Sequence, residues 1–252
     1  MSTLIRPLVG LGLLALVLTG AGAGGVIAQS TRTDPGTPPA DSEPTTSATL
    51  QPGEVTAGQI ADRIAAAWTS VTSYRAVSTL NSRDGTPVAT PLADVSASSE
   101  REVVLPDTKR LVIREGGAMT EIVLIKGVLS KRVTPVGGEP GAWETVDPAT
   151  VDDNDPFKLT YETILAPEQP PYSGLSGRQR DRIGTEIGTI EINGRDCVGY
   201  LFPEVSETGE SFDVVIYLDE TDLPCRIETR TLAISQTDYV FNEPIAIATP
   251  AT

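Results

Sequence analysis

The stretch VVIYLDETDLPCRIE, residues 214–228, contains one strand, a tight acidic turn and the start of a second strand. Val, Ile and Tyr dominate its first part, and β-branched and aromatic residues are enriched in strands. The segment DETDLP that follows is rich in Asp and Pro, which are typical turn residues. Because so short a turn joins antiparallel neighbours, residues 212–219 and 224–233 are predicted to form a hairpin.

The same pattern of strands and short turns continues on both sides of this hairpin. The dipeptide Asn193-Gly194 is a strong signal for a two-residue hairpin turn between two further strands. Earlier in the chain the turns PDT, GG and KG separate consecutive strands, which predicts a meander. The ten predicted strands cover residues 74–80, 94–106, 109–116, 119–127, 128–134, 181–192, 195–205, 212–219, 224–233 and 237–250.

Two helices are predicted beside these strands. Thr56 and Gln59 form a capping box, and apolar residues from Ile60 to Val71 then recur at helical spacing. A shorter helix is predicted over residues 156–165, with Asp155 as its N-cap and a proline in its first position. The fold class is therefore α+β, dominated by one long antiparallel sheet.

So large a sheet is expected to curl or to pack on another layer. Only two helices are available to cover it, so we expect them to form a lid of limited area over a curved sheet. Such a geometry leaves an apolar concavity between sheet and helices, which is a usual place for a ligand pocket. The alternative is that side chains fill this space, and the sequence leaves both interpretations open.

The composition limits the chemistry that the chain can perform. The formal net charge is −15 and the chain has no histidine. A surface this acidic repels the phosphates of nucleic acids and anionic lipid headgroups, so neither is expected as an electrostatic partner of the surface. Without His, the Ser-His and Cys-His nucleophile pairs and His-ligated zinc are excluded. The acidic run at residues 152–155 lacks the spacing of a calcium loop and is interpreted as a solvated turn. We therefore assign no catalytic residue, metal or cofactor, and predict that the chain is not an enzyme.

Residues 1–28 have the three-part layout of a secretory signal peptide. A basic start without acids precedes an apolar core at residues 8–20, and small residues then lead to a cleavage site before Gln29. The alternative is an uncleaved membrane anchor, which needs about 20 residues. Residues 29–53 are rich in Pro, Ser and Thr and are predicted to be a disordered linker, which leaves 54–250 as the globular domain. The protein is expected to work outside the cytoplasm, either secreted or tethered by its N-terminal segment.

Cys197 and Cys225 are the only two cysteines, and two cysteines in an exported chain usually pair. The predicted hairpins place Cys197 opposite about Asp219 and Cys225 opposite about Tyr217, on the two sides of the strand at 212–219. Next-but-one strands are about 10 Å apart, whereas a disulfide needs Cα atoms within about 7 Å. A bulge or a slipped register would close that gap. A disulfide and two buried free thiols therefore both remain open.

The order of several short motifs resembles a known family. REVVLPDTKRLVIREG is followed by TEIVLIKGVLSKR and by the Trp-containing GAWETV. Then come IGTIEINGRDCVGYLF, VVIYLDETDLPCRIE and finally TDYVFNEPIAIATP. This order is similar to the LolA-like periplasmic lipoprotein-carrier superfamily, in particular its LppX/LprG-like lipid-binding branch, with RseB-type domains as relatives. The resemblance covers about residues 54–250. The structural positions that it carries over are Pro106, Gly194, Asp219, Thr221, Pro224 and Pro244.

The resemblance implies an unclosed half β-barrel of about ten to eleven antiparallel strands with helices in its concave face. The implied function is non-catalytic binding or carriage of a lipid, glycolipid or lipoprotein acyl chain by a monomer in the cell envelope. The alternative is a regulatory or sensor module that binds a membrane protein partner, as RseB-type domains do. For each apolar wall position the other interpretation is plain core packing. The lipid-binding wall candidates are Ile64, Trp68, Val103, Leu111, Ile113, Ile122, Leu124, Phe157, Tyr161, Ile164, Tyr200, Val215 and Tyr217.

Overall fold

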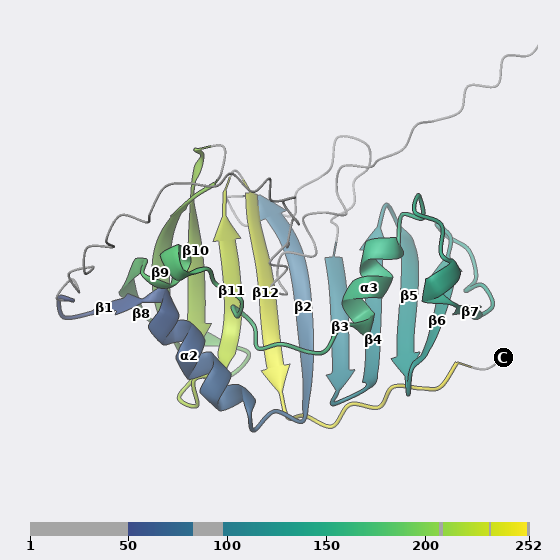
Figure 1. The fold of residues 1–252 in the computed structure, drawn as a ribbon, viewed down its shortest axis with the longest axis horizontal. Coiled ribbons are helices and arrows are strands. Elements are labelled where there is room, and N and C mark those ends of the chain that lie inside the picture. Colours follow the sequence, from purple (N-terminus) through teal and green to yellow (C-terminus); the bar gives the residue numbers. More distant parts are fainter. Residues whose placement is uncertain (1–49, 83–97, 207–208, 232, 251–252) are drawn as a thin grey trace, which may run out of the picture.

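One long curved sheet forms the body of the molecule, with helices lying along it (Figure 1). The structure is a computed structural model. It describes residues 50–82, 98–206, 209–231 and 233–250. The predicted signal peptide and the predicted linker up to residue 49 lie outside these residues. Within the described ranges no helix is long and apolar enough to cross a membrane.

Twelve described strands form a single sheet in which all neighbours are antiparallel. Their order across the sheet is β1-β8-β9-β10-β11-β12-β2-β3-β4-β5-β6-β7. The sheet is therefore built from two meanders joined side by side, since β12 pairs with β2. The strands are β1 (Glu54–Thr56), β2 (Ser73–Ser82), β3 (Ser98–Val104), β4 (Thr108–Glu115), β5 (Ala118–Ile125), β6 (Val128–Thr134), β7 (Glu144–Val146), β8 (Ile183–Ile192), β9 (Arg195–Val205), β10 (Ser211–Leu218), β11 (Pro224–Arg230) and β12 (Ala233–Phe241).

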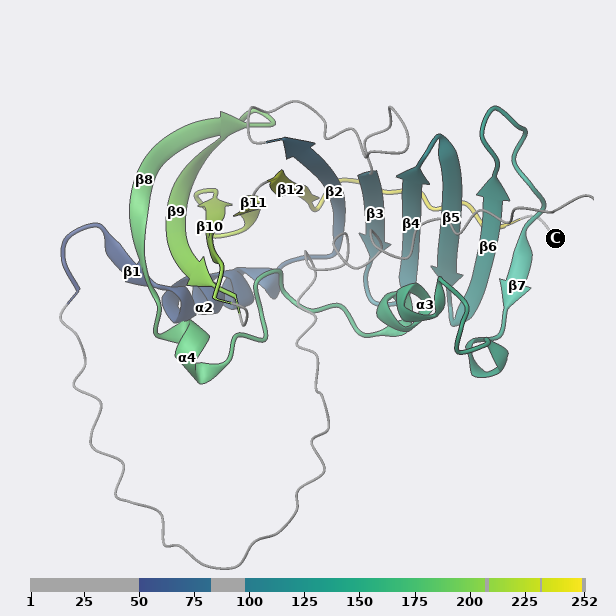
Figure 2. The same cartoon turned by 90° about the horizontal axis from the view of Figure 1, so that it is seen from above.

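The sheet does not close into a barrel, because its two outer strands, β1 and β7, do not pair with each other. Both are three residues long, and neither was predicted. Seen from above, the sheet bends most strongly at β8 and β9, and the helices α2, α3 and α4 lie on one side of it (Figure 2). We call this side the helix face. The predicted α+β class and unclosed antiparallel sheet are confirmed.

The first helix, α2 (Ala57–Trp68), begins where its sequence predicts. The Thr56 hydroxyl accepts a hydrogen bond from the Gln59 backbone at 3.1 Å, and the Gln59 side chain accepts one from the Thr56 backbone at 2.8 Å. The predicted capping box is thus present. The apolar stripe of the helix buries Ile60 and Ile64 completely, which turns this side of α2 toward the sheet.

The second helix starts later than predicted. α3 spans Lys158–Leu165, and its N-cap is Phe157, without a side-chain capping bond. The expectation that Asp155 caps this helix was wrong. Instead, the Asp155 carboxylate accepts a hydrogen bond from the Phe157 backbone at 2.7 Å and so holds the preceding turn. A 3-10 helix, η2 (Pro148–Thr150), also lies before α3.

A third short helix, α4 (Gly177–Arg180), lies in a segment for which no helix was predicted. Ser176 and Gln179 form a capping box at its start, with the Ser176 backbone donating to the Gln179 side chain at 2.9 Å. The spacing S-x-x-Q is a recognised helix-start signal. The segment is rich in Pro and Gly and only four helical residues follow this signal, too few to show a helical period.

The turn between β10 and β11 is organised by one carboxylate. Asp219 Oδ1 accepts hydrogen bonds from the backbone of Thr221 at 2.9 Å and of Leu223 at 3.2 Å. The pairing then shifts, because Tyr217 pairs with Arg226 whereas the next residue of β10 pairs with Pro224. One residue of β11, Cys225, is therefore left over as a bulge.

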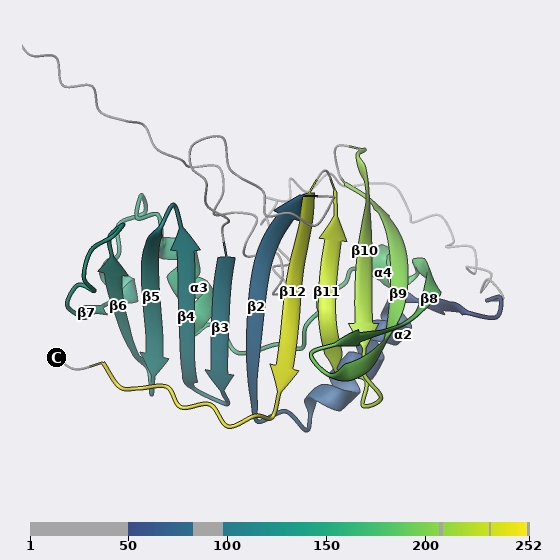
Figure 3. The ribbon, with the colours of Figure 1, turned by 180° about the vertical axis from the view of Figure 1, so that it is seen from behind.

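This bulge accounts for the disulfide between Cys197 and Cys225, whose Cα atoms are 6.5 Å apart. The bond links β9 to β11 past the strand between them. Seen from behind, the end of the β8–β9 hairpin crosses over β10 and β11 (Figure 3). Arg195 at this end lies 2.8 Å from Asp219 Oδ2 and donates to the Tyr239 carbonyl. The bulge and the folded hairpin together shorten the distance that regular strand spacing would impose.

Candidate functional site

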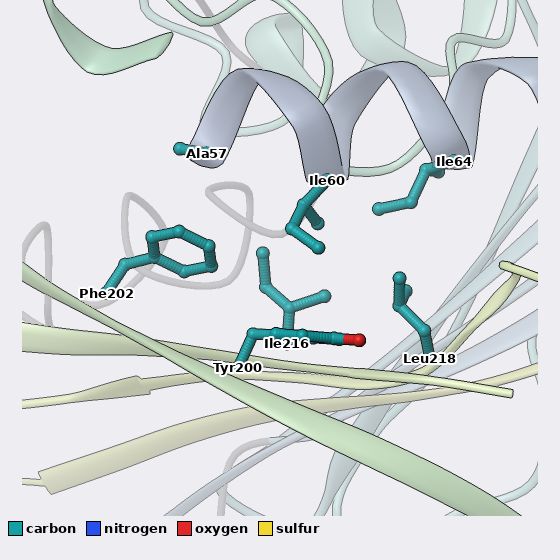
Figure 4. Close-up of a cluster of buried hydrophobic side chains, with 7 residues drawn as sticks. All are labelled: Ala57, Ile60, Ile64, Tyr200, Phe202, Ile216 and Leu218. Atoms are coloured by element: carbon teal, nitrogen blue, oxygen red, sulfur yellow. The ribbon is translucent and has the colours of Figure 1, made fainter. Parts of the chain in front are cut away.

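The candidate site is the helix face of the sheet, and its first part lies under α2. Ile60 and Ile64 project from the helix toward side chains of β9 and β10 (Figure 4). Two of the predicted wall residues, Ile64 and Tyr200, belong to this cluster. Its buried members are Ala57, Ile60, Ile64, Tyr200, Phe202, Ile216 and Leu218.

Arg63 fastens α2 to the turn between β10 and β11. Its Nε donates to Asp222 Oδ1 at 3.0 Å, and its guanidinium carbon lies 5.5 Å from the centroid of the Tyr200 ring. The hydrogen bond to Asp222 raises the pKa of Arg63 above its usual value. The helix is thus tied to the sheet by a polar contact at its edge as well as by its apolar stripe.

An aromatic group occupies the middle of the helix face, beside the end of α2. The Trp68 ring lies 5.4 Å from Tyr74 and 6.0 Å from Phe241, measured between centroids. The fully buried Val103 of β3 packs in the same cluster. The predicted wall residues Trp68 and Val103 are therefore neighbours, although they come from a helix and from a strand.

A third apolar cluster lies under α3. Tyr161 and Ile164 of the helix pack on three buried residues of β5 and β6, and Lys131 of β6 lies 5.2 Å from the centroid of the Phe157 ring. Ile113 is half-buried on the same face of β4 as Leu111, outside the cluster. The predicted wall residues that this cluster brings together are Leu111, Ile122, Leu124, Phe157, Tyr161 and Ile164.

Val215 and Tyr217 do not line this interior. Side chains alternate along β10, and the neighbouring Ile216 and Leu218 take the side that faces α2. Val215 and Tyr217 pack instead with the two disulfide cysteines in a separate cluster on the opposite side. Their inclusion among the wall candidates is corrected for this reason. The sequence pattern VVIYL is apolar at every position, so alternation alone could not distinguish the two faces.

Between the α2 and α3 clusters lies a buried group of charged side chains, which we call the ionic cluster: Arg101, Lys109, Glu168 and Tyr74. Glu168 Oε1 lies 2.5 Å from an Arg101 nitrogen and 2.8 Å from Lys109 Nζ. Its other oxygen, Oε2, accepts a hydrogen bond from the Tyr74 hydroxyl. Only 2% of the Lys109 side chain and 5% of the Glu168 side chain are exposed. A salt bridge this deeply buried is rare on a sheet face that is otherwise apolar.

The surroundings of the ionic cluster shift its pKa values. Burial alone would raise the pKa of Glu168, but the charge of Arg101 and the hydrogen bonds from Lys109 and Tyr74 outweigh burial and lower it below its usual value. Burial also raises the pKa of Tyr74 far above its usual value. Glu168 is therefore ionised and Tyr74 is neutral at physiological pH.

Glu168 reaches the cluster from an irregular segment, residues 166–176, which we call the strap. The strap runs from the end of α3 across the helix face to α4 (Figure 1). Lys109 Nζ donates to the carbonyl of Ala166, at the start of the strap, at 2.5 Å. Near its other end, Tyr172 and Leu175 pack against the α2 cluster. The strap therefore covers the middle of the helix face with very little regular structure.

The charged members of the ionic cluster were not predicted from the sequence. A signal for two of them exists, because Arg101 has the same strand parity as Val103, and Lys109 has the same parity as Leu111. A cation on the apolar side of a strand needs a buried counter-ion. No local pattern connects Glu168 to these strands, since it lies 67 residues from Arg101 in the chain.

Across the described ranges no three His, Cys, Asp or Glu residues lie close enough together to hold a metal ion. The acidic run at residues 152–155 forms a local turn, in which Asp152 Oδ1 accepts a hydrogen bond from the Asn154 backbone at 2.7 Å. The helix face thus offers apolar surface, aromatic rings and a cationic centre. Such an environment suits the binding of an amphiphile.

No family model matches the sequence, and no curated protein matches it. Solved structures match the fold at low sequence identity. LprF from Mycobacterium bovis matches with a TM-score of 0.47 and 14% identity, over 78% of this chain and 97% of that chain. The Mycobacterium tuberculosis lipoprotein LppX matches with a TM-score of 0.44 and 11% identity, over 76% of this chain and 98% of that chain.

A third match is MucB, in the Pseudomonas aeruginosa complex of MucA and MucB. Its TM-score is 0.40 and its identity 14%, over 75% of this chain and 58% of that chain. LolA superfamily proteins also match, with lower scores. In these four comparisons the sequence identity is 14% or less and the TM-score is below 0.5.

Proposed function

We propose that the chain binds an amphiphile outside the cytoplasm and carries it without catalysing a reaction. The ligand is a lipid, a glycolipid or the acyl chains of a lipoprotein, held between the helices and the sheet. The observation that carries this proposal is the composition of the helix face. Apolar side chains from widely separated strands meet there in clusters under α2 and α3, on either side of the strap.

The elements that cover this interior are small, which supports reversible opening. α2 has 12 residues and α3 has 8, and the strap between α3 and α4 is irregular. Helices this short depend on their packing for stability, and segments with little regular structure open more readily than the strands beneath them. Displacement of α3 and the strap would uncover Leu111, Ile122 and Leu124 for contact with acyl chains.

The proposed location outside the cytoplasm has two supports. The disulfide between Cys197 and Cys225 persists in an oxidising compartment and is rare in the cytosol. The first 28 residues have the pattern of a secretory signal, which is an inference from the sequence.

Native mass spectrometry of the purified full-length chain tests the proposed function. We expect a co-purifying amphiphile that organic extraction removes and that the extracted chain takes up again. A chain that never retains an amphiphile, and that takes up none from mixed micelles, would contradict the proposal.

A pair of substitutions on β4 tests the location of the ligand. Leu111 lies on the helix face, and the next residue, Val112, is fully buried on the opposite face. Leu111→Ala removes apolar contact area and should weaken amphiphile binding about fivefold or more, at about 0.8 kcal/mol per methylene group. Val112→Ala is the control, since it disturbs the same strand without touching the interior. Equal weakening by both variants would show that the loss reflects stability rather than contact.

A second candidate function is a regulatory module that binds a membrane protein partner. The observation in its favour is the outer edge of β8, where β1 pairs only with residues 183–185. Beyond them, Ile187 and Ile190 are 46% and 41% exposed. An exposed edge of this kind can accept an extended segment of another protein. If a lipid-free chain bound a purified single-span membrane protein, and Ile190→Lys abolished this binding, the second function would be favoured.

A further inference from the structure

The ionic cluster contains more positive than negative charge. Arg101 and Lys109 contribute two positive charges and Glu168 one negative charge, which leaves a surplus of one. Among the described residues no other carboxylate lies within 4.0 Å of either cation. A buried charge without a counter-ion is unfavourable, so this surplus needs a reason. The overall composition does not explain this local surplus of positive charge, because the whole chain is acidic, with a net charge of −15.

The hydrogen-bonding capacity of Arg101 is also incompletely used. Its Nε is buried and has no hydrogen-bond partner, and only one of its terminal nitrogens donates to Glu168. A guanidinium presents five N–H donors in a planar fork that suits two oxygens of a carboxylate or a phosphate. Arg101 therefore has donors available for an anion that offers more oxygen atoms than Glu168 does.

The two cations and their counter-ion belong to different parts of the fold. Arg101 on β3 pairs with Leu111, and Lys109 on β4 pairs with Val103, so the cations are diagonal neighbours within the sheet. Glu168 instead comes from the strap. When the strap moves, its carboxylate leaves with it, while the two cations remain in place.

We propose that Arg101 and Lys109 bind the anionic phosphodiester headgroup of an amphiphile, and that Glu168 occupies this headgroup site in the ligand-free protein. The proposal rests on the proposed function and adds the class of ligand to it. Apolar surface lies on both sides of the cations, with Trp68 toward α2 and Leu111 toward α3. The acyl chains of the ligand extend from the headgroup along these two surfaces.

Fluorescence titration of the full-length chain with two labelled lipids tests this inference. The probes are phosphatidylglycerol, which is anionic, and diacylglycerol, which has no charge. We expect the chain to bind phosphatidylglycerol about tenfold more tightly, because charge-assisted hydrogen bonds form only with its phosphate. Equal affinities would overturn the headgroup site but leave the proposed function intact. Binding of neither lipid would count against the proposed function itself.

Two substitutions that each remove one positive charge test whether the preference for the anionic lipid comes from this site. Arg101→Gln leaves Lys109 and Glu168 as a balanced pair, so the fold is retained, and it should weaken phosphatidylglycerol binding about tenfold without changing diacylglycerol binding. The control is Arg110→Gln, which removes one positive charge from the opposite face of β4, where Arg110 pairs with Glu102 and Glu121. Equal weakening by both variants would reduce the effect to net charge and would overturn the headgroup site.

A third variant and a competitor complete the test. Glu168→Gln removes the internal competitor and should tighten phosphatidylglycerol binding, with thermal unfolding used to verify that the variant is folded. Unchanged or weaker binding by a folded Glu168→Gln variant would contradict the role given to Glu168. Millimolar inorganic phosphate should not displace the lipid, because it lacks acyl chains. Displacement would assign the two cations to a free anion and would overturn the lipid headgroup.

Discussion

Lys109 shows at the scale of one residue how the helix face is held together. Lysine is rarely buried unless it is paired, yet this side chain is only 2% exposed. Its ammonium group donates to the carbonyl of Ala166 and lies 2.8 Å from Glu168 Oε1. Ala166 is the C-cap of α3, where a positive charge interacts favourably with the helix dipole. One lysine therefore anchors both the end of α3 and the strap to β4.

Glu168 should make the stability of the protein depend on pH. Glu168→Gln is expected to lower the free energy of unfolding by about 3 kcal/mol at neutral pH, because it leaves two buried cations without a carboxylate. The pKa of Glu168 is lowered in the folded state, so its contribution is complete above the unfolded pKa of about 4.3. The contribution is lost as the pH falls through the folded pKa. Urea unfolding of wild type and variant at neutral and acidic pH measures this change.

The difference in stability between wild type and Glu168→Gln should therefore shrink on acidification. Glu162→Gln is a suitable control, since Glu162 is an exposed carboxylate of α3. Its substitution should change stability by less than about 0.5 kcal/mol at any pH. A Glu168→Gln effect of the same size at both pH values would show that the ionised carboxylate is not its cause.

At the scale of the element, α2 is the part of the fold that depends most on local sequence. Its capping box satisfies backbone groups at the first turn, and its stripe of isoleucines faces the sheet. Thr56 is at the same time the last residue of β1, where it pairs with Ile183 of β8. The start of the helix is thus positioned both by its own side chain and by the edge of the sheet.

Thr56→Ala removes the side-chain half of this capping box. The variant should lose about 1 kcal/mol of stability, because the Gln59 backbone N–H loses its hydrogen-bond partner. Urea unfolding measures the loss. Thr56→Ser keeps the hydroxyl oxygen, so its free energy of unfolding should differ from that of the wild type by only about a few tenths of a kcal/mol. If serine destabilised the chain as much as alanine, the effect would come from packing of the threonine methyl group.

At the scale of the whole molecule, the disulfide fixes how β9 lies relative to β11 across the strand between them. It joins β9 to β11 on the face opposite the helices, among Val215, Tyr217 and the other residues of that cluster. The β8–β9 hairpin folds over its neighbours at this point (Figure 3). The bond is therefore separated from the proposed ligand site by the thickness of the sheet.

Loss of the disulfide should lower stability without changing the type of ligand bound. The two cysteines are 28 residues apart, and closing a loop of that length stabilises a fold by about 3.5 kcal/mol in the chain-entropy model. Cys197→Ala combined with Cys225→Ala should approach this loss in urea unfolding, and amphiphile binding should persist in the folded variant. Reduced wild-type protein provides the control and should match the double variant. Equal stability of oxidised and reduced wild type would contradict the prediction.

Much of the fold could be predicted from the sequence, because its signals are local. The hairpin turn at Asn193-Gly194 is present with φ values of 51° and 75°, as a turn of this kind requires. The capping box of α2 and the long strands are likewise present. The short elements β1, β7 and α4 were missed, since three or four residues are too few to show a period. Of the wall candidates, Val215 and Tyr217 could not be assigned to a face, because the segment VVIYL is apolar at every position.

The sequence by itself determined the strands, their antiparallel order within each meander, the turns and the first helix, because propensity, alternation and capping act over a few residues. Only the tertiary structure decided which residues meet across the sheet. It brings Glu168 to Arg101, 67 residues away in the chain, and it joins the two cysteines through a bulge whose position no sequence pattern predicts. Such contacts depend on the curvature of the sheet and on the path of the strap, which are properties of the whole chain packed together.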